Sequence, residues 1–298
     1  MHEFDLWRFQ EESVQAVMEG MNIVRSYQLR EKSIGEASIK KADDTFLTMA
    51  DRECGVFLRE FLKKQFPNIR SNIEDADAMS ADSRITIYGD PVDGTLPFTV
   101  GLPTSTVILG AYDTEAKRVL SCVIGEPALR RLWRTVNGES YWWAWDLPNS
   151  AIRTPRPISV WRGELSVNTA VLLDHCQGFK RSGRQILTND EVGKLMTRLA
   201  RYRLLLTGSN GLHQAMVAQG NDKMAGAITS AIGGPQDVCG VKLVLGAGGA
   251  ARAFRMNDDR TLAEESPEAI EDYDILVVGN NQNTVDVLTA DLFSIVER

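Results

Sequence analysis

The hexapeptide Asp90-Pro-Val-Asp-Gly-Thr95 brings two carboxylates, a proline and a glycine into one short stretch. It follows RITIYGD, in which apolar residues alternate as in a strand. Carboxylates three residues apart in a turn can direct their oxygens to one point, and Gly94 lets the backbone approach a ligand. Pro97 suits the first turn of a helix, whose N-terminus favours a phosphate. The hexapeptide therefore favours a site for a divalent cation and a phosphate; the alternative is a simple Asx-Pro turn leading into a helix.

The periodicity outside this turn predicts both helices and strands. Apolar residues near a 3.6-residue period predict helices over residues 4–30 and 48–66, and an acidic loop is predicted over residues 71–83. TSTVILGAYD, RVLSCVIGEP and RRLWRTVNGESYWW are predicted strands, with a hairpin turn at Asn137-Gly138. The second half mixes predicted strands (TAVLLDH, VKLVLG, DILVVG) with predicted helices over residues 189–202, 212–219 and 284–296. This order predicts sheets covered by helices, a layered α/β or α+β fold.

A polar connection that contains Pro148, Pro155 and Pro157 divides the sequence into residues 1–150 and 151–298. We expect the two halves to form one compact unit. The first half would carry most of the carboxylates of the site, and the second half a late ligand and the substrate contacts.

The composition is that of a globular protein and argues against several classes. The chain has 298 residues, a formal charge of −7, 43% hydrophobic residues and 24% charged residues. The acidic balance argues against a nucleic-acid polymer as partner, and no apolar run approaches the roughly 20 residues of a membrane span. The four cysteines and three histidines have no zinc or disulfide spacing. The N-terminus is acidic and amphipathic, unlike a secretory signal, so we expect a cytoplasmic protein.

The hexapeptide is part of an ordered set of motifs. Thr48-Met-Ala-Asp51 and Glu74-Asp75 precede it, and Gly208-Ser-Asn-Gly-Leu212 and then Asp237 follow it. In this order the motifs resemble those of the inositol monophosphatase superfamily, from about Lys41 to the last predicted helix. The resemblance implies an αβαβα sandwich of alternating helix and sheet layers. It also implies a magnesium-dependent, lithium-sensitive phosphomonoesterase that hydrolyses a small phosphorylated metabolite with a metal-bound water, and a homodimer.

The resemblance further implies a set of metal ligands. Glu74 and Asp90 would bind a first Mg²⁺ ion with the backbone carbonyl of Val92, and Asp90, Asp93 and Asp237 would bind a second. Magnesium prefers oxygen ligands, and converging carboxylates repel one another unless cations neutralise them. Two metals roughly 3.5–4 Å apart can stabilise both the attacking and the leaving oxygen of a displacement.

The same resemblance assigns the catalytic and phosphate-binding groups. Thr95, with Glu74 or Asp51, would orient the attacking water, and the amides of Gly94 and Thr95 would hold the phosphate. Because the metal lowers the pKa of its water, no cysteine or histidine nucleophile is required.

The substrate is less well defined by the sequence. Ser209 and Asn210 are candidates for substrate contact. The family's inositol phosphatases place a glutamate about seven residues before the late aspartate, where this chain has Thr229-Ser230. We expect an inositol phosphate or a related polyol or sugar phosphate. The alternative within this chemistry is a nucleotide 3′-phosphate such as adenosine 3′,5′-bisphosphate, which would require a base-stacking aromatic residue near the site.

Two further alternatives belong to other classes. The stretch Val241-Lys-Leu-Val-Leu-Gly246, followed by Gly248-Gly249, resembles a strand and glycine turn of a dinucleotide-binding fold, which would suit an NADP-dependent oxidoreductase. Departures from the family pattern at Asp75, Pro97 and Gln236 leave open a catalytically silent member that binds a phosphorylated ligand.

Overall fold

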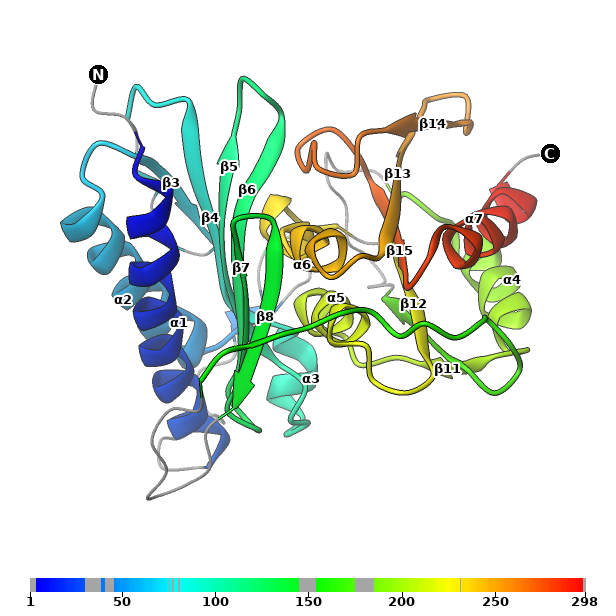
Figure 1. Cartoon of the computed structure of the whole chain (residues 1–298), viewed down its shortest axis with the longest axis horizontal. Helices are drawn as coiled ribbons and strands as arrows, with labels where there is room; N and C mark the ends of the chain where they lie inside the picture. The colour runs from blue at the N-terminus through cyan, green and yellow to red at the C-terminus, as the bar shows by residue number, and fades with distance from the viewer. Residues whose placement is uncertain are drawn as a thin grey trace.

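The computed structural model describes residues 4–29, 39–40, 46–74, 76, 78–79, 81–144, 154–174, 185–230 and 232–296. Its elements form five alternating layers: a helix pair, a sheet, a second helix pair, a second sheet and a third helix pair (Figure 1). The predicted αβαβα sandwich is therefore confirmed. Among the described residues, no helix combines the length and the apolar character needed to cross a membrane.

The first sheet has seven strands in the order β3-β4-β5-β6-β7-β8-β9. β3 runs parallel to β4, and the other neighbours are antiparallel. Both faces of its centre are covered: Val107 and Leu109 lie in the core under the first helix pair, and Ile108 lies in the core under the second. The strands are β3 (Arg70–Ile73), β4 (Ile85–Asp93), β5 (Thr106–Asp113), β6 (Arg118–Glu126), β7 (Arg131–Val136), β8 (Glu139–Ala144) and β9 (Arg156–Pro157).

Helices α1 (Leu6–Gln28) and α2 (Met49–Gln65) cover the outer face of this sheet (Figure 1). The start of α2 is fixed by a capping box, in which Thr48 accepts from the amide of Asp51 and the Asp51 carboxylate accepts from the amide of Thr48. A two-stranded ribbon, β1 (Ile39–Lys40) and β2 (Phe46–Leu47), precedes this cap. The helices predicted over residues 4–30 and 48–66 are thus confirmed.

The second sheet has six strands in the order β11-β10-β12-β15-β13-β14. Helices α5 (Asn210–Gln219) and α6 (Val241–Gly246) fill the space between the two sheets, and α4 (Asn189–Leu199) and α7 (Gln282–Val296) cover the far face (Figure 1). The strands are β10 (Ala170–Asp174), β11 (Arg203–Leu205), β12 (Met224–Thr229), β13 (Ala250–Met256), β14 (Leu262–Glu265) and β15 (Ile275–Gly279). Two shorter helices, α3 (Thr95–Thr99) and the 3₁₀ helix η2 (Pro235–Val238), lie next to the acidic residues described below.

One element was predicted as the wrong type. The sequence VKLVLG, predicted as a strand, is helix α6, and the glycines after it lead into strand β13. Because α6 lies between two sheets, it is apolar on several sides, and its short apolar run cannot be told from a buried strand by periodicity. A dinucleotide turn needs a strand before its glycines and a helix after them, and here the order is reversed. The NADP-dependent alternative thereby loses its structural basis.

The sequence also missed short strands. Residues 70–73, at the start of the predicted acidic loop, form β3 with alternating burial. β12 was missed because its residues, MAGAIT, are small and carry little strand signal, although the strand is fully buried. Both omissions concern the site, because β3 ends one residue before Glu74 and β12 lies beside α5.

Candidate functional site

Three acidic side chains from separate segments converge at one edge of the first sheet. Glu74, Asp90 and Asp237 each offer a carboxylate oxygen, and these oxygens lie within 4.8 Å of one another. Glu74 directly follows β3, and its amide donates to the carbonyl of Gly89, so it lies beside Asp90 across the parallel pair. Asp237 comes from η2, which packs against β4. We call Glu74, Asp90 and Asp237 the acid cluster.

Backbone amides fix two members of the acid cluster. The amide of Val92 donates to Oδ1 of Asp90 at 2.9 Å, which closes an Asx turn at the proline. The amides of Gly233 and Gly234 donate to Oδ2 of Asp237 at 2.6 and 3.3 Å. Asp237 therefore both closes the turn before η2 and faces the other two acids.

Asp93 lies beside the acid cluster and caps helix α5. Its Oδ2 accepts from the hydroxyls of Ser209 (2.5 Å) and Thr106 (2.7 Å) and from the amide of Gly211 (2.8 Å). Its Oδ1 accepts from the amide of Asn210 at 3.1 Å. Both oxygens are thus engaged within the protein, and only Oδ1, with one donor, retains an evident lone pair for a cation.

Thr95 and Asp51 form a hydroxyl–carboxylate pair at the rim of the cluster. The Thr95 hydroxyl lies 3.3 Å from Oδ1 of Asp51 and 3.0 Å from the carbonyl oxygen of Val92. The other oxygen of Asp51 accepts from the Thr48 amide at 2.8 Å, so the carboxylate is held by its own helix start. The capping box that begins α2 therefore also aims Asp51 at Thr95.

Gly94 allows the tight turn from β4 into α3. Its φ of +87° lies in the left-handed region, and a Cβ atom there would come within 2.9 Å of the carbonyl oxygen of Gly208. The amides in the first turn of α3 have no partner within the helix, as in any helix start. The predicted phosphate donors, the amides of Gly94 and Thr95, therefore begin a helix beside the acid cluster.

The predicted substrate contacts, Ser209 and Asn210, are directed inward. Ser209 is fully buried and caps α5. The Asn210 carboxamide oxygen accepts from the hydroxyl of Thr229 at 3.1 Å. Both residues therefore hold α5 and Asp93 in place in this structure, and their contact with a substrate stays a prediction. Asp75, where the sequence departs from the family pattern, lies outside the described residues.

The electrostatics of the acid cluster favour a bound cation. The pKa of Asp90 is raised well above its usual range, mainly by burial and to a smaller extent by repulsion from Glu74. The pKa of Asp237 is raised well above its usual range for the same two reasons. Among the described residues, no cationic side chain pairs with Asp90, Asp93 or Asp237. The donor set is entirely carboxylate oxygen, which is the chemistry of Mg²⁺ ligands, so the residues fit such an ion.

Sequence reasoning missed three residues that hold this site. Thr106 donates to Asp93 from the neighbouring strand, and Gln214 on α5 donates to the backbone carbonyl of Asp237 at 2.7 Å. Gln236 donates to Oε2 of Glu74 at 3.2 Å. Each contact depends on strand register or on packing between distant segments, for which the sequence carries no local signal.

The aromatic residues that could have stacked on a base lie elsewhere. Trp142 and Trp143 are on β8, four strands from β4 and therefore roughly 19 Å away along the sheet. Trp143 is buried in the core under the first helix pair, and Trp142 packs against the other core. Trp145 lies outside the described residues.

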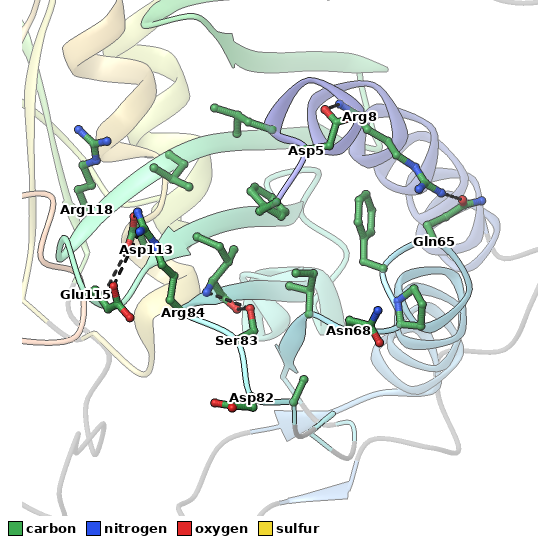
Figure 2. Close-up of a pocket in the computed structure, with 18 residues that line it drawn as sticks. Asp5, Arg8, Gln65, Asn68, Asp82, Ser83, Arg84, Asp113, Glu115 and Arg118 are labelled. Carbon is green, nitrogen blue, oxygen red and sulfur yellow. Dashed lines mark hydrogen bonds and ion pairs between the residues drawn. The ribbon is translucent and has the colours of Figure 1, made fainter. Parts of the chain in front are cut away.

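A groove of about 1210 Å³ lies at the opposite end of β4 from the acid cluster (Figure 2). Its wall includes Ile85, and about 17 Å of strand separates this residue from Asp90. Arg84 pairs with two acids: its Nη2 lies 2.5 Å from Oδ2 of Asp113, and its Nη1 lies 3.8 Å from Oε2 of Glu115. Figure 2 shows these three side chains together. The groove contains none of the predicted site residues, and its central arginine already pairs with neighbouring acids.

The layered fold and the acid cluster together define a class of α+β proteins. In this class, carboxylate oxygens that could bind a cation gather where strands end and helices begin. The family model described as the inositol monophosphatase family matches residues 5–290. The chain belongs to the inositol monophosphatase family, and the resemblance seen in the sequence is confirmed. Membership supports phosphatase activity on phosphate monoesters.

Solved structures of similar fold include the extragenic suppressor protein suhB from Bartonella henselae, with a TM-score of 0.73 and 19% identity over 95% of this chain and 97% of that one. An inositol monophosphatase from Anabaena (Nostoc) has a TM-score of 0.68 and 20% identity, covering 98% of this chain and 97% of the other. An inositol monophosphatase–fructose 1,6-bisphosphatase has a TM-score of 0.65 and 15% identity, covering 95% and 98%. These identities establish likeness of fold only. Among curated proteins, no match to the sequence was found.

Proposed function

We propose that this protein is a magnesium-dependent phosphomonoesterase whose cation is held by the acid cluster. The observation that carries the proposal is the convergence of Glu74, Asp90 and Asp237, with no cationic partner for the two aspartates among the described residues. Asp93 would add its Oδ1, and the carbonyl of Val92 is a further candidate oxygen. A bound Mg²⁺ ion would supply positive charge that neutralises these acids and polarises the phosphoryl group.

The protein's own groups would prepare the attacking water. If the Thr95 hydroxyl donates to Oδ1 of Asp51, its oxygen lone pairs would be able to accept a hydrogen bond from a water molecule. The water's own lone pair is then free to attack phosphorus. Its proton can pass to Oγ of Thr95 as the threonine proton passes to Asp51, which acts as the general base. The first-turn amides of α3, at Gly94 and Thr95, would hold the phosphate oxygens during this step.

The substrate class we propose is an inositol phosphate or a related polyol or sugar phosphate. The solved relatives that carry inositol monophosphatase or fructose 1,6-bisphosphatase in their names favour this class. Thr229 and Ser230 stand where the family's inositol phosphatases carry a ring-binding glutamate. Their hydroxyls donate to the carboxamide oxygen of Asn210 and to the backbone carbonyl of Asp174, respectively. Selectivity for inositol would therefore have to come from other residues. The position of Trp142 and Trp143 on β8 removes the aromatic support expected for a nucleotide 3′-phosphate.

Phosphate release tests this proposal. A panel of inositol 1-phosphate, fructose 1,6-bisphosphate and adenosine 3′,5′-bisphosphate would be assayed with Mg²⁺ and with chelator. We expect Mg²⁺-dependent release from at least one polyol or sugar phosphate, and inhibition by lithium. Release from adenosine 3′,5′-bisphosphate alone would favour the nucleotide alternative. Magnesium binding without release from any substrate would favour a silent, ligand-binding member.

We also propose that the protein forms a homodimer. Leu96, Val100 and Leu102 in and after α3, and Leu205 and Leu206 at β11, are exposed. A hydrogen bond of 2.9 Å from the hydroxyl of Thr104 to the carbonyl of Thr207 joins these two segments. Exposed apolar side chains gathered at an edge strand support a protein interface. A monomeric mass by light scattering at micromolar concentration would contradict this proposal.

A further inference from the structure

Gln236 links two segments of the acid cluster. It precedes Asp237 in η2, is only 8% exposed, and its Nε2 donates to Oε2 of Glu74 at 3.2 Å across 162 positions of sequence. The side chain folds back over Gly234, where an added Cβ would lie 2.4 Å from its Oε1. The glycine therefore leaves the space through which Gln236 reaches Glu74.

The contact with Gln236 gives the Glu74 carboxylate a hydrogen-bond donor from another segment of the chain. The carboxylates of Asp90 and Asp237 accept from backbone amides of their own turns, whereas Glu74 accepts from the side-chain carboxamide of Gln236. A glutamine suits this position because it donates a hydrogen bond to a carboxylate without adding a charge. An acid at this position would increase the repulsion, and an aliphatic side chain would leave this carboxylate oxygen without the contact.

We propose that Gln236 is a positioning residue that sets the cation affinity of the acid cluster by holding the Glu74 carboxylate toward Asp90 and Asp237. The inference rests on the proposed function, because it assumes that the cluster binds Mg²⁺. Partners that orient metal ligands commonly change metal affinity by about 10–100-fold when they are removed.

The test compares Mg²⁺ affinity, measured by calorimetry, in the wild type and in Gln236→Met, which keeps the length of the side chain but lacks the donor. We expect the dissociation constant to rise about 10-fold. The Mg²⁺ concentration for half-maximal phosphate release should rise by the same factor, and kcat at saturating Mg²⁺ should fall by a smaller factor. A purely structural role would lower kcat through loss of folded protein and leave the affinity of the remainder unchanged.

Gln219→Met is the matched control. Gln219 accepts from Nε1 of Trp133 at 3.1 Å and lies at the other end of α5, so its loss removes a glutamine hydrogen bond without touching the acid cluster. We expect wild-type Mg²⁺ affinity in this variant.

A second variant tests the contact if Gln236→Met folds poorly. Gln236→Glu keeps the shape but places an acid against Glu74, so the melting temperature in chelator should fall and excess Mg²⁺ should restore it. The Mg²⁺-induced rise in melting temperature should therefore exceed that of the wild type. An unchanged rise, or an unchanged dissociation constant in folded Gln236→Met, would overturn the positioning role alone. Absence of Mg²⁺ binding in the wild type would overturn the proposed function and this inference with it.

Discussion

At the scale of single residues, the aspartates of the hexapeptide differ in what already surrounds their carboxylates. Asp93 accepts four hydrogen bonds, and these oppose the rise in its pKa that burial causes. Asp90 accepts one from Val92 and faces other acids, so nothing comparable opposes the rise in its pKa. Two identical residue types three positions apart therefore differ in their contacts: Asp93 ties β4 to α5, and Asp90 is the one that we propose mainly as a cation ligand.

Asp90→Asn tests the second of these roles. The variant removes one negative charge and keeps an oxygen for the Val92 amide, so the metal-free protein should gain stability as repulsion falls. Phosphate release should drop by about 100-fold or more, because even residues outside the ligand shell cost 10–100-fold. Steady-state assays and thermal melts in chelator measure both effects. Wild-type turnover in this variant would exclude Asp90 from the site.

Asp93→Asn is the same change with the opposite expected effect on stability. Whichever way the carboxamide turns, its NH₂ group meets the amide of either Asn210 or Gly211, so one buried donor loses its acceptor. We expect the free energy of unfolding in chelator to fall by about 1–3 kcal/mol. Denaturant melts of the two variants side by side measure the difference. A metal-free Asp93→Asn protein more stable than the wild type would show that charge repulsion outweighs the cap.

At the scale of elements, the turn between β4 and α3 sets how closely the hexapeptide approaches α5. Gly94 has a left-handed φ, and the Gly208-Ser209 turn leaves no room for a side chain there. Gly101, just after α3, has a similar φ of +82° but no atom within 4 Å of an added Cβ. A side chain at Gly101 would therefore meet only the backbone strain of a left-handed φ, whereas one at Gly94 would meet both this strain and a steric contact.

Gly94→Ala and Gly101→Ala make use of this pair. Both variants incur the left-handed backbone penalty of roughly 1–2 kcal/mol, and Gly94→Ala must also displace the Gly208 carbonyl. We expect Gly101→Ala to lower the free energy of unfolding by that amount and to retain activity. Gly94→Ala should lose more stability and most activity. Equal activity in the two variants would show that the turn does not shape the site.

The elements also show how far the sequence predicts this molecule. The hexapeptide, the first two helices and the strands β4 to β8 of the first sheet were predicted because hydrophobic period and turn chemistry are local, whereas β3 was missed. Helix α6 was predicted as a strand because a middle layer between two sheets makes it apolar on several sides. Thr106, Gln214 and Gln236 were not identified as part of the site, because their partners are set by register and packing between distant segments.

At the scale of the whole molecule, the five layers are arranged so that acids from both halves meet. β3 and β4 deliver Glu74 and Asp90 from the first sheet, and η2 delivers Asp237 from the segment between β12 and α6. The resulting concentration of negative charge opposes folding, and a bound cation would relieve it. Stability should therefore depend jointly on pH and on Mg²⁺.

The direction of this dependence follows from the pKa shifts. Burial and repulsion raise the pKa values of Asp90 and Asp237 above those of the unfolded chain. Between the unfolded and the raised folded values, the native state binds more protons than the unfolded state, so the free energy of unfolding falls as pH rises. Burial also lowers the pKa of His213 to about 3, which opposes this trend below the usual histidine pKa of about 6.5. We therefore expect the melting temperature in chelator to fall from about pH 6.5 to pH 8, and excess Mg²⁺ to reduce this fall. A melting temperature in chelator that rises over this range would contradict the raised pKa values.

Binding of Mg²⁺ by the acid cluster is tested most directly by a crystal of this protein grown with Mn²⁺ in place of Mg²⁺ and measured for anomalous scattering. We predict an anomalous peak bounded by the carboxylates of Glu74, Asp90 and Asp237, with oxygen contacts of about 2.1 Å if the ion binds as Mg²⁺ does. A well-ordered acid cluster without such a peak, or a peak held by other residues, would contradict it.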